Sequence, residues 1–174
     1  MPAAPARKPR QGPDSLVPAQ AVADPAHRVL RRFRLVFNAV KTHFQQVEKQ
    51  AGIGGAQVWA LSLVAAQPGL GVGALAREMD IHQTTASNLV RGLVAAGHLE
   101  SQRSETDRRS SLLGLTPAGA AVLARAPGPF SGVLPDALEQ LDAATLERLD
   151  ADLATLLTLL HTDRRAERIP LADM

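Results

Sequence analysis

Two short amphipathic segments in close succession constrain the fold of this 174-residue chain more than any other feature. The segments "GALAREM" and "HQTTASNLVRGLVAAG" are separated only by "DI", and each spaces its apolar residues by three or four positions. Such spacing puts side chains on one face of a helix. Gly97 is the last residue of the second segment, where a glycine commonly ends a helix. This pattern predicts a helix-turn-helix with these core-facing residues: Leu75, Ala76, Met79, Ala86, Leu89, Val90 and Leu93.

A β-hairpin is predicted directly after the helix-turn-helix. The segments "HLESQR" and "SSLLGLT" have strand-like apolar content, and they flank the polar stretch "SETDRRSS" at 104–111. The next segment, "TPAGAAVLARA", restarts a helix with Thr116 as its N-cap and Pro117 at its first position. The polar stretch is either a solvated turn or a loop that presents its arginines to a partner. Its composition alone leaves both interpretations open.

Long helices are predicted on both sides of this central part. Residues 24–52 form one helix, with Asp24 as N-cap, Pro25 in the first turn and Gly52 just past the end. Its apolar stripe is wide enough to need a partner and comprises Val29, Leu30, Phe33, Val36, Phe37, Val40, Phe44 and Val47. The segment "GGAQVWALSLVAAQPG" predicts a second helix, apolar nearly all round and therefore near the middle of the core.

The C-terminal part predicts a broken helical region. "PGP" at 127–129 interrupts the helix that Thr116 begins, because proline lacks an amide proton and restricts the residue before it. A short helix, "PDALEQL", follows, and Asp142 caps a last helix. The last helix carries a seam typical of helix–helix interfaces, formed by Leu146, Leu149, Leu153, Leu156 and Leu160.

Composition excludes several classes of protein. The chain has no cysteine, so it has no disulfide framework, thiolate metal site or catalytic cysteine. Its five histidines lack the spacing of metal ligands, and neither a phosphate-binding loop nor a nucleophile elbow is present. We therefore expect no enzyme, no metal and no cofactor. The longest apolar run is too short to span a bilayer, and the N-terminus lacks a secretory apolar region, so we expect a soluble cytoplasmic protein.

Charge is distributed unevenly although the net charge is only +2. Residues 1–50 carry nine Lys or Arg against three Asp or Glu, whereas residues 127–174 carry four against nine. A basic start and an acidic end can attract each other across a fold or a dimer. The basic start can equally attract nucleic acid, through a local footprint rather than a globally charged surface.

Two segments, "ALAREMDIHQTTASNLVRGLVAAGHLE" and "TDRRSSLLGLTPAG", resemble the helix-turn-helix and the wing of the MarR family of winged helix-turn-helix transcriptional regulators. The wing pattern of that family is matched by Asp107, Arg109, Leu115, Thr116 and Gly119. The resemblance covers roughly residues 25–160. It implies a mainly α fold with a small β-hairpin wing, an obligate homodimer, DNA binding and often a small-molecule effector. Gly73 and "PGP" depart from the pattern, Gly73 because it takes the expected N-cap position of the first motif helix.

The predicted organisation follows from these segments. A flexible basic arm rich in Pro and Ala precedes the first dimerisation helix, and a winged helix-turn-helix lobe separates that helix from the C-terminal dimerisation helices and a tail. The respective ranges are 1–23, 24–52, 53–116, 117–160 with an interruption at 127–129, and 161–174.

Helix 82–96 is the predicted recognition helix, because its polar entry suits the major groove. Gln and Asn side chains can bond adenine in two places, and Arg is absent before position 91, so we expect an A·T-leaning inverted-repeat operator. Thr85 and Arg91 are expected on phosphates. The alternative interpretation is that the polar start of this helix is only a solvated surface. The candidate DNA-contacting residues of this helix are Gln83, Thr84, Thr85, Ser87, Asn88 and Arg91.

The wing, residues 104–110, is the second predicted DNA contact, in the minor groove. Asp107 orients one guanidinium, Arg108 or Arg109 enters the groove, and Arg103 clamps a phosphate. The alternative is a charged hairpin loop in which Asp107 simply pairs with an arginine, for little gain. A winged helix that serves only protein contacts is the alternative to the whole DNA-binding hypothesis.

The resemblance further implies a repressor that a small organic effector releases from DNA, by changing the spacing of the two recognition helices. Candidate effector-pocket residues are Phe37, His43, Phe44 and Trp59. The alternative interpretation is that each of the four is an ordinary core residue or a polar residue whose hydrogen bonds are satisfied within the protein.

Overall fold

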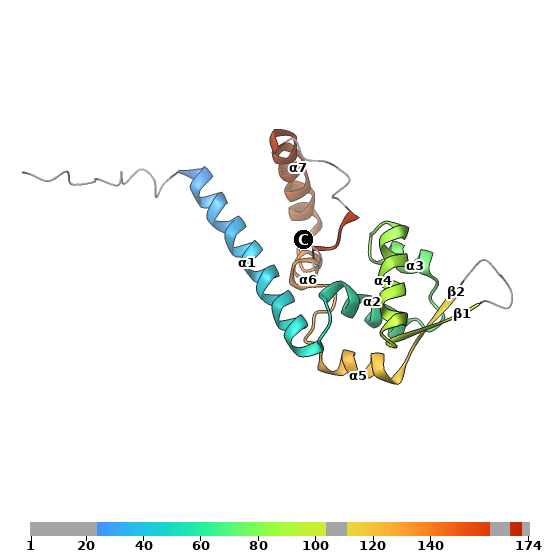
Figure 1. Ribbon diagram of the computed structural model, residues 1–174. Coiled ribbons are helices and arrows are strands. Elements are labelled where there is room, and N and C mark those ends of the chain that lie inside the picture. Colours follow the sequence, from blue (N-terminus) through green and yellow to red (C-terminus); the bar gives the residue numbers. More distant parts are fainter. Residues whose placement is uncertain (1–23, 104–110, 161–167, 172–174) are drawn as a thin grey trace, which may run out of the picture. The chain divides into compact units, whose positions relative to one another are not determined.

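A computed structural model describes residues 24–103, 111–160 and 168–171 (Figure 1). Within these ranges the chain forms seven α-helices and one antiparallel pair of strands, which confirms the mainly α class with a small β-hairpin. The chain divides into two compact units, Met1–Val36 and Phe37–Met174. The elements in chain order are α1 (Pro25–Ala51), α2 (Gly55–Ala66), α3 (Val72–Glu78), α4 (Gln83–Ala95), β1 (Leu99–Arg103), β2 (Ser111–Leu115), α5 (Pro117–Arg125), α6 (Val133–Glu139) and α7 (Ala143–Leu160).

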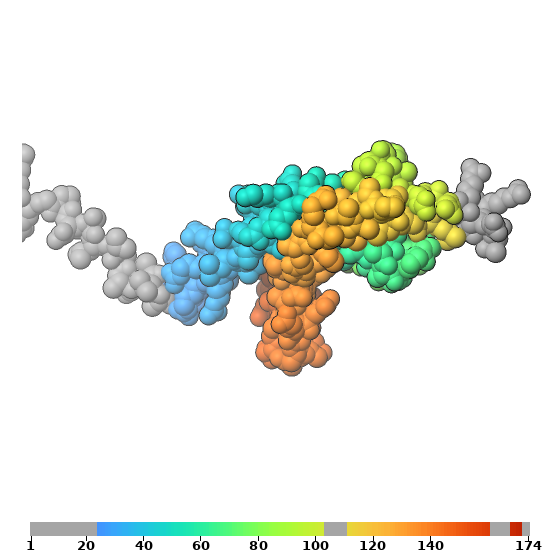
Figure 2. Space-filling model, turned by 90° about the horizontal axis from the view of Figure 1, so that it is seen from below, coloured from blue at the N-terminus to red at the C-terminus, as the bar shows by residue number. Residues whose placement is uncertain are grey.

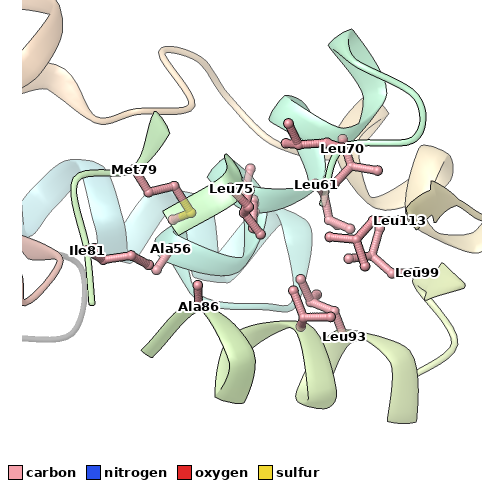
Figure 3. Close-up of a cluster of buried hydrophobic side chains, with 14 of the residues drawn as sticks. Ala56, Leu61, Leu70, Leu75, Met79, Ile81, Ala86, Leu93, Leu99 and Leu113 are labelled. Carbon is pink, nitrogen blue, oxygen red and sulfur yellow. The ribbon is translucent and has the colours of Figure 1, made fainter. Parts of the chain in front are cut away.

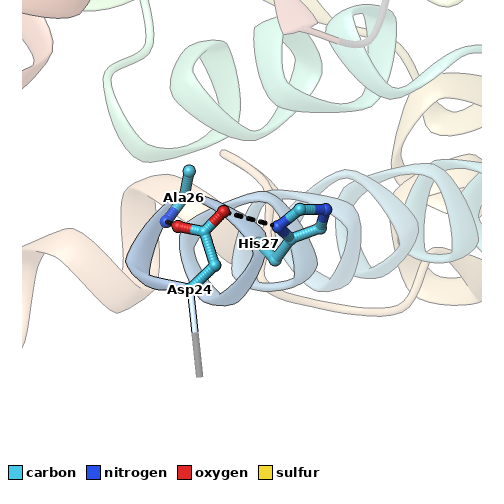
Figure 4. A network of polar contacts seen from close by, with 3 residues as sticks. All are labelled: Asp24, Ala26 and His27. Atoms are coloured by element: carbon cyan, nitrogen blue, oxygen red, sulfur yellow. Dashed lines mark hydrogen bonds and ion pairs between the residues drawn. The ribbon is translucent and has the colours of Figure 1, made fainter. Parts of the chain in front are cut away.

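In the first unit, Asp24 caps the start of α1 as predicted (Figure 4). The Ala26 N–H donates to Asp24 Oδ1 at 3.0 Å, and Asp24 Oδ2 lies 2.8 Å from His27 Nδ1. The hydrogen bond with the His27 side chain is the main reason why the pKa of Asp24 is lowered, followed by the Ala26 amide. The predicted stripe of this helix is solvent-exposed in this unit at Val29, Leu30 and Val36.

The second unit contains the predicted helix-turn-helix, formed by α3 and α4. His82 is the N-cap of α4, and it makes no capping hydrogen bond through its side chain. The N-cap of α3 is Gly71 and not Gly73, because the helix begins at Val72, so the cap lies two positions earlier than the sequence pattern indicated. The turn between the helices includes Asp80 at φ 49°, a backbone conformation that aspartate tolerates better than most residues.

The core of this unit lies where α2, α3, α4 and the hairpin meet (Figure 3). Leu75 of α3 stands in its centre, between Met79 on one side and Leu61 and Leu113 on the other. Six of the seven predicted core-facing residues of the helix-turn-helix are buried, and Leu89 is partly buried against the same cluster. The apolar helix α2 is central, as predicted, with Val58, Ala60, Leu61 and Val64 buried.

The hairpin is fixed to the helical core along β2. Leu99 pairs with Leu115 and Arg103 with Ser111 in antiparallel register. The backbone of β2 also bonds the loop before α3, since Gly69 N–H donates to Leu113 O and Leu113 N–H donates to Leu70 O, both at 3.0 Å. Leu99 and Leu113 are buried, so the strands are held by packing as well as by hydrogen bonds.

Thr116 fixes the start of α5 to the start of β1. Its hydroxyl oxygen accepts from the Gly119 N–H at 3.0 Å, and the hydroxyl donates to Gly97 O at 2.7 Å. Gly119 passes so close to the strand that an added Cβ would lie 2.2 Å from His98 O. The predicted N-cap at Thr116 and first position at Pro117 are confirmed.

The C-terminal helices are less enclosed, and neither α6 nor α7 has a buried residue. In the space-filling view, the orange segment that contains α6 projects from the rest of the second unit (Figure 2). The interruption at "PGP" is confirmed, since α5 ends at Arg125 and α6 begins at Val133. Asp142 caps α7 by accepting the Thr145 N–H at 2.9 Å, and hydrogen bonds from the Thr145 side chain and then its backbone lower the pKa of Asp142.

Candidate nucleic-acid interface

Helix α4 has one buried side and one exposed polar side. Ala86, Val90 and Leu93 are buried in the core and hold the helix in place. The predicted contact residues lie on the other sides: Gln83, Thr84, Asn88 and Arg91 are exposed, whereas Thr85 and Ser87 are half-buried. A helix held in this way presents amide, hydroxyl and guanidinium groups on a rigid support, as base and phosphate contacts in a groove require.

Ser87 differs from its neighbours, because its hydroxyl donates to Gln83 O of the same helix at 2.7 Å. The donor is therefore used within the helix, and the oxygen keeps only its capacity to accept. Of the predicted contact residues in α4, Gln83 and Asn88 offer an exposed amide group with both donors and an acceptor.

A shallow hollow of about 360 Å³ lies between α4 and the start of α2. It is lined by Thr85 and Asn88 from α4 and by Gln57 from α2. Gln57 Oε1 accepts the Gly54 N–H at 3.1 Å, which holds the Gln57 side chain at the start of α2. The sequence analysis did not include Gln57 among the contact residues, and the only signal was its polarity in a helix whose one other polar side chain is that of Ser62.

Strand β1, which leads to the predicted wing, follows α4. Arg103 lies at the end of β1, where its backbone pairs with Ser111. The other predicted wing residues, Asp107, Arg108 and Arg109, lie outside the described residues, as do the arm at 1–23 and most of the tail.

A cavity of about 410 Å³ lies within the second unit. Two of the four predicted pocket residues, Phe44 and Trp59, line it. Phe37 is 68% exposed, and His43 is buried elsewhere with its Nε2 lacking a hydrogen-bond partner. Lining residues that the sequence analysis missed come from the loop before α6, from α6 and from the C-terminal end: Phe130, Ser131, Pro135, Leu138, Ile169, Pro170 and Leu171.

The described residues contain no group of three or more His, Cys, Asp or Glu that could hold a metal ion. In the same ranges, no helix combines the length and the apolar character needed to cross a membrane.

The fold and the exposed face of α4 define a winged helix-turn-helix protein. Residues 51–110 match the family model described as MarR family. Among solved structures, the chain is similar to a MepR-like protein crystallised with pseudoligands, at 16% identity over 76% of this chain and 94% of that chain, with a TM-score of 0.53. It is also similar to MepR of S. aureus in complex with DNA, at 22% identity over 79% and 99%, with a TM-score of 0.53.

BldR of Sulfolobus solfataricus is a third similar structure, at 20% identity over 78% of this chain and 96% of that one, with a TM-score of 0.50. At these identities the likeness shows a common fold. No curated protein matches the sequence significantly. The match to the MarR family model is limited to the part of the chain from the end of α1 to residue 110.

Proposed function

We propose that the chain is a dimeric, sequence-specific DNA-binding transcriptional regulator. A small-molecule effector binds it and releases it from DNA. The observation that carries this proposal is the exposed polar face of α4, with Gln83, Asn88 and Arg91 opposite a fully buried side. A solved relative of the same fold, MepR, is bound to DNA, which supports the same use of the fold here. More specifically, we propose that this regulator is a cytoplasmic repressor of transcription.

Dimerisation is supported by apolar residues that the single chain leaves exposed. Leu30 and Val36 of α1 belong to the predicted stripe and are 47% and 40% exposed, and Leu157 and Leu160 of α7 are 45% and 59% exposed. Exposed apolar stripes on long helices mark surfaces that a partner covers. A second copy of the chain would supply that partner and would place two recognition helices on an inverted repeat.

The effector site we propose is the cavity lined by Phe44 and Trp59. Its wall is mostly apolar with a few polar groups, and its volume is in the range of small-molecule sites. An effector acts only if it binds one arrangement of the recognition helices better than the other. Phe37 and His43, which do not line this cavity, stay candidates only for a site that the dimer completes.

The test of DNA binding uses DNA from the region upstream of the protein's own coding sequence. The affinity should fall steeply as salt rises, because bound phosphates release counterions. Gln83→Ala and Asn88→Ala should each cost about 1–3 kcal/mol at the specific site only, whereas Arg91→Ala should weaken binding to all sequences alike.

Matched controls are Gln45→Ala and Asn38→Ala, which change exposed residues of the same types on α1. These two variants should bind DNA as the wild type does. Affinity that does not depend on salt, or equal losses in the α1 and α4 variants, would support the winged helix as a protein-interaction module instead.

A further inference from the structure

The C-terminal segment Arg168–Leu171 returns to the winged helix-turn-helix lobe, the part formed by α2 to α5 and the hairpin (Figure 1, red). Pro170 is buried, and Ile169, Pro170 and Leu171 together form part of the wall of the cavity that Trp59 and Met79 also line. The end of the chain therefore contributes to the proposed effector site, although the sequence predicted only a tail there.

The first residue of this segment reaches the start of the recognition helix. Arg168 Nε lies 3.9 Å from Asp80 Oδ1, and Asp80 belongs to the turn between α3 and α4. Arg168 also lines a shallow hollow of about 330 Å³ together with Arg77, His82 and Gln83. One side of the segment thus faces the cavity, and the other places a cation next to a candidate base-contacting residue.

The segment is held loosely enough to be displaced. The side chains of Arg168 and Asp80 are 57% and 88% exposed, so their ion pair contributes little. Ile169 and Leu171 are 46% and 43% exposed, which leaves Pro170 as the one buried residue of the segment. A ligand that fills the cavity would compete for the same apolar wall.

We propose that Arg168–Leu171 couples the cavity to DNA binding. When it is seated, Arg168 binds a DNA phosphate beside Gln83, and a ligand in the cavity unseats the segment and removes this contact. The proposal rests on the DNA-binding function proposed above. Asp80 is the one charged residue in the described cavity wall, so the ligand we infer is an apolar molecule that is either uncharged or cationic.

Seating can be measured without DNA, because Trp59 is the only tryptophan of the chain and lies in the cavity wall. Acrylamide quenching of its fluorescence in the full chain should be about twofold stronger for Leu171→Ser than for the wild type, since the segment no longer covers the cavity. The matched control is Leu35→Ser, a 71% exposed leucine of α1 outside the apolar stripe, which should quench as the wild type does. Equal quenching of Leu171→Ser and wild type would overturn the proposal.

Coupling is tested by a double-mutant cycle on DNA. Arg168→Ala should weaken DNA binding about fivefold and reduce the salt slope by about one, as the loss of one phosphate contact requires. Leu171→Ser should give a similar loss, and the double variant should lose no more than either single one. Arg31→Ala, an exposed arginine on the far side of α1 from its stripe, is the control and should leave affinity unchanged.

Independent, additive losses in the cycle, or an Arg168→Ala variant with wild-type affinity and salt slope, would overturn the coupling. A wild type that binds no DNA would instead overturn the proposed function, and the Trp59 measurement would still show whether the segment seats on the cavity.

Discussion

The winged helix-turn-helix lobe, formed by α2 to α5 and the hairpin, and the flanking helices differ in how far their apolar residues are buried. In the lobe, Leu61, Leu75 and Leu93 are completely buried within one chain. In α6 and α7 no residue is buried, and α1 leaves Leu30 and Val36 exposed. The contrast indicates that the lobe is stabilised by its own core, whereas the flanking helices need a further surface to cover their apolar side chains.

The largest expected effect is on the lobe. Gly119→Ala should destabilise it by at least about 3 kcal/mol, because the new Cβ would lie 2.2 Å from a backbone carbonyl, His98 O, and neither backbone can move freely. The control is Gly92→Ala inside α4, where the nearest atom is 4.0 Å away. The free energy of unfolding of that variant should rise by up to about 1 kcal/mol, because alanine has a higher helix propensity than glycine. Urea unfolding measures both, and similar stabilities would show that the lobe is not tightly packed there.

The next effect concerns the flanking helices. Leu30→Glu should weaken self-association about a hundredfold, or about 3 kcal/mol, because it places a charge in an interface that excludes water. Leu35→Glu, off the stripe and 71% exposed, should leave association unchanged. Sedimentation equilibrium distinguishes the two. A wild type that sediments as a monomer would contradict the role of the stripe, whereas the stability of the lobe should be the same in both variants.

A smaller effect is expected in the wing. Arg109→Ala should weaken binding to sites with A·T tracts by about 1 kcal/mol, and Arg108→Ala by less, because a narrow minor groove attracts one inserted guanidinium. Competition between A·T-rich and G·C-rich flanks on otherwise identical DNA measures the difference. If both variants bind like the wild type, the octapeptide at 104–111 is only a turn.

The smallest effect concerns the cap of α7. The pKa of Asp142 is lowered by its bonds with Thr145, so the ionised form favours the folded helix. The stabilisation is present above the ordinary pKa of 3.8 and is lost as pH falls through the lowered value. Asp142→Asn, which keeps an acceptor without the charge, should therefore speed amide exchange at Thr145 near neutral pH but not in strong acid. The Gly119 amide, bonded to the hydroxyl of Thr116, is the control and should not respond.

Features of the fold that depend on local rules could be predicted from the sequence. Asp24, Thr116 and Asp142 are caps because a side-chain oxygen reaches an amide two or three residues ahead. The core faces of α3 and α4 follow from helical periodicity alone. The predicted N-cap of α3, Gly73, was wrong by two positions, because Gly71 and Gly73 both lack the side chain that would mark a cap.

The cavity could be predicted only in part, because its wall joins distant segments. Phe44 and Trp59 stand on helices whose apolar faces the sequence shows, whereas Phe130 and Pro170 reach the cavity from a loop and from the chain end. No periodicity connects such segments. The same reason explains why Gln57 was missed, since its position beside Asn88 depends on how α2 packs against α4.

The central claim is that two copies of α4 read DNA together, and footprinting on DNA upstream of the protein's own coding sequence tests it most directly. We predict protection of two half-sites, related as an inverted repeat and centred about one helical turn apart. Protection of a single half-site would contradict the claim, and so would uniform protection of the DNA without an inverted repeat.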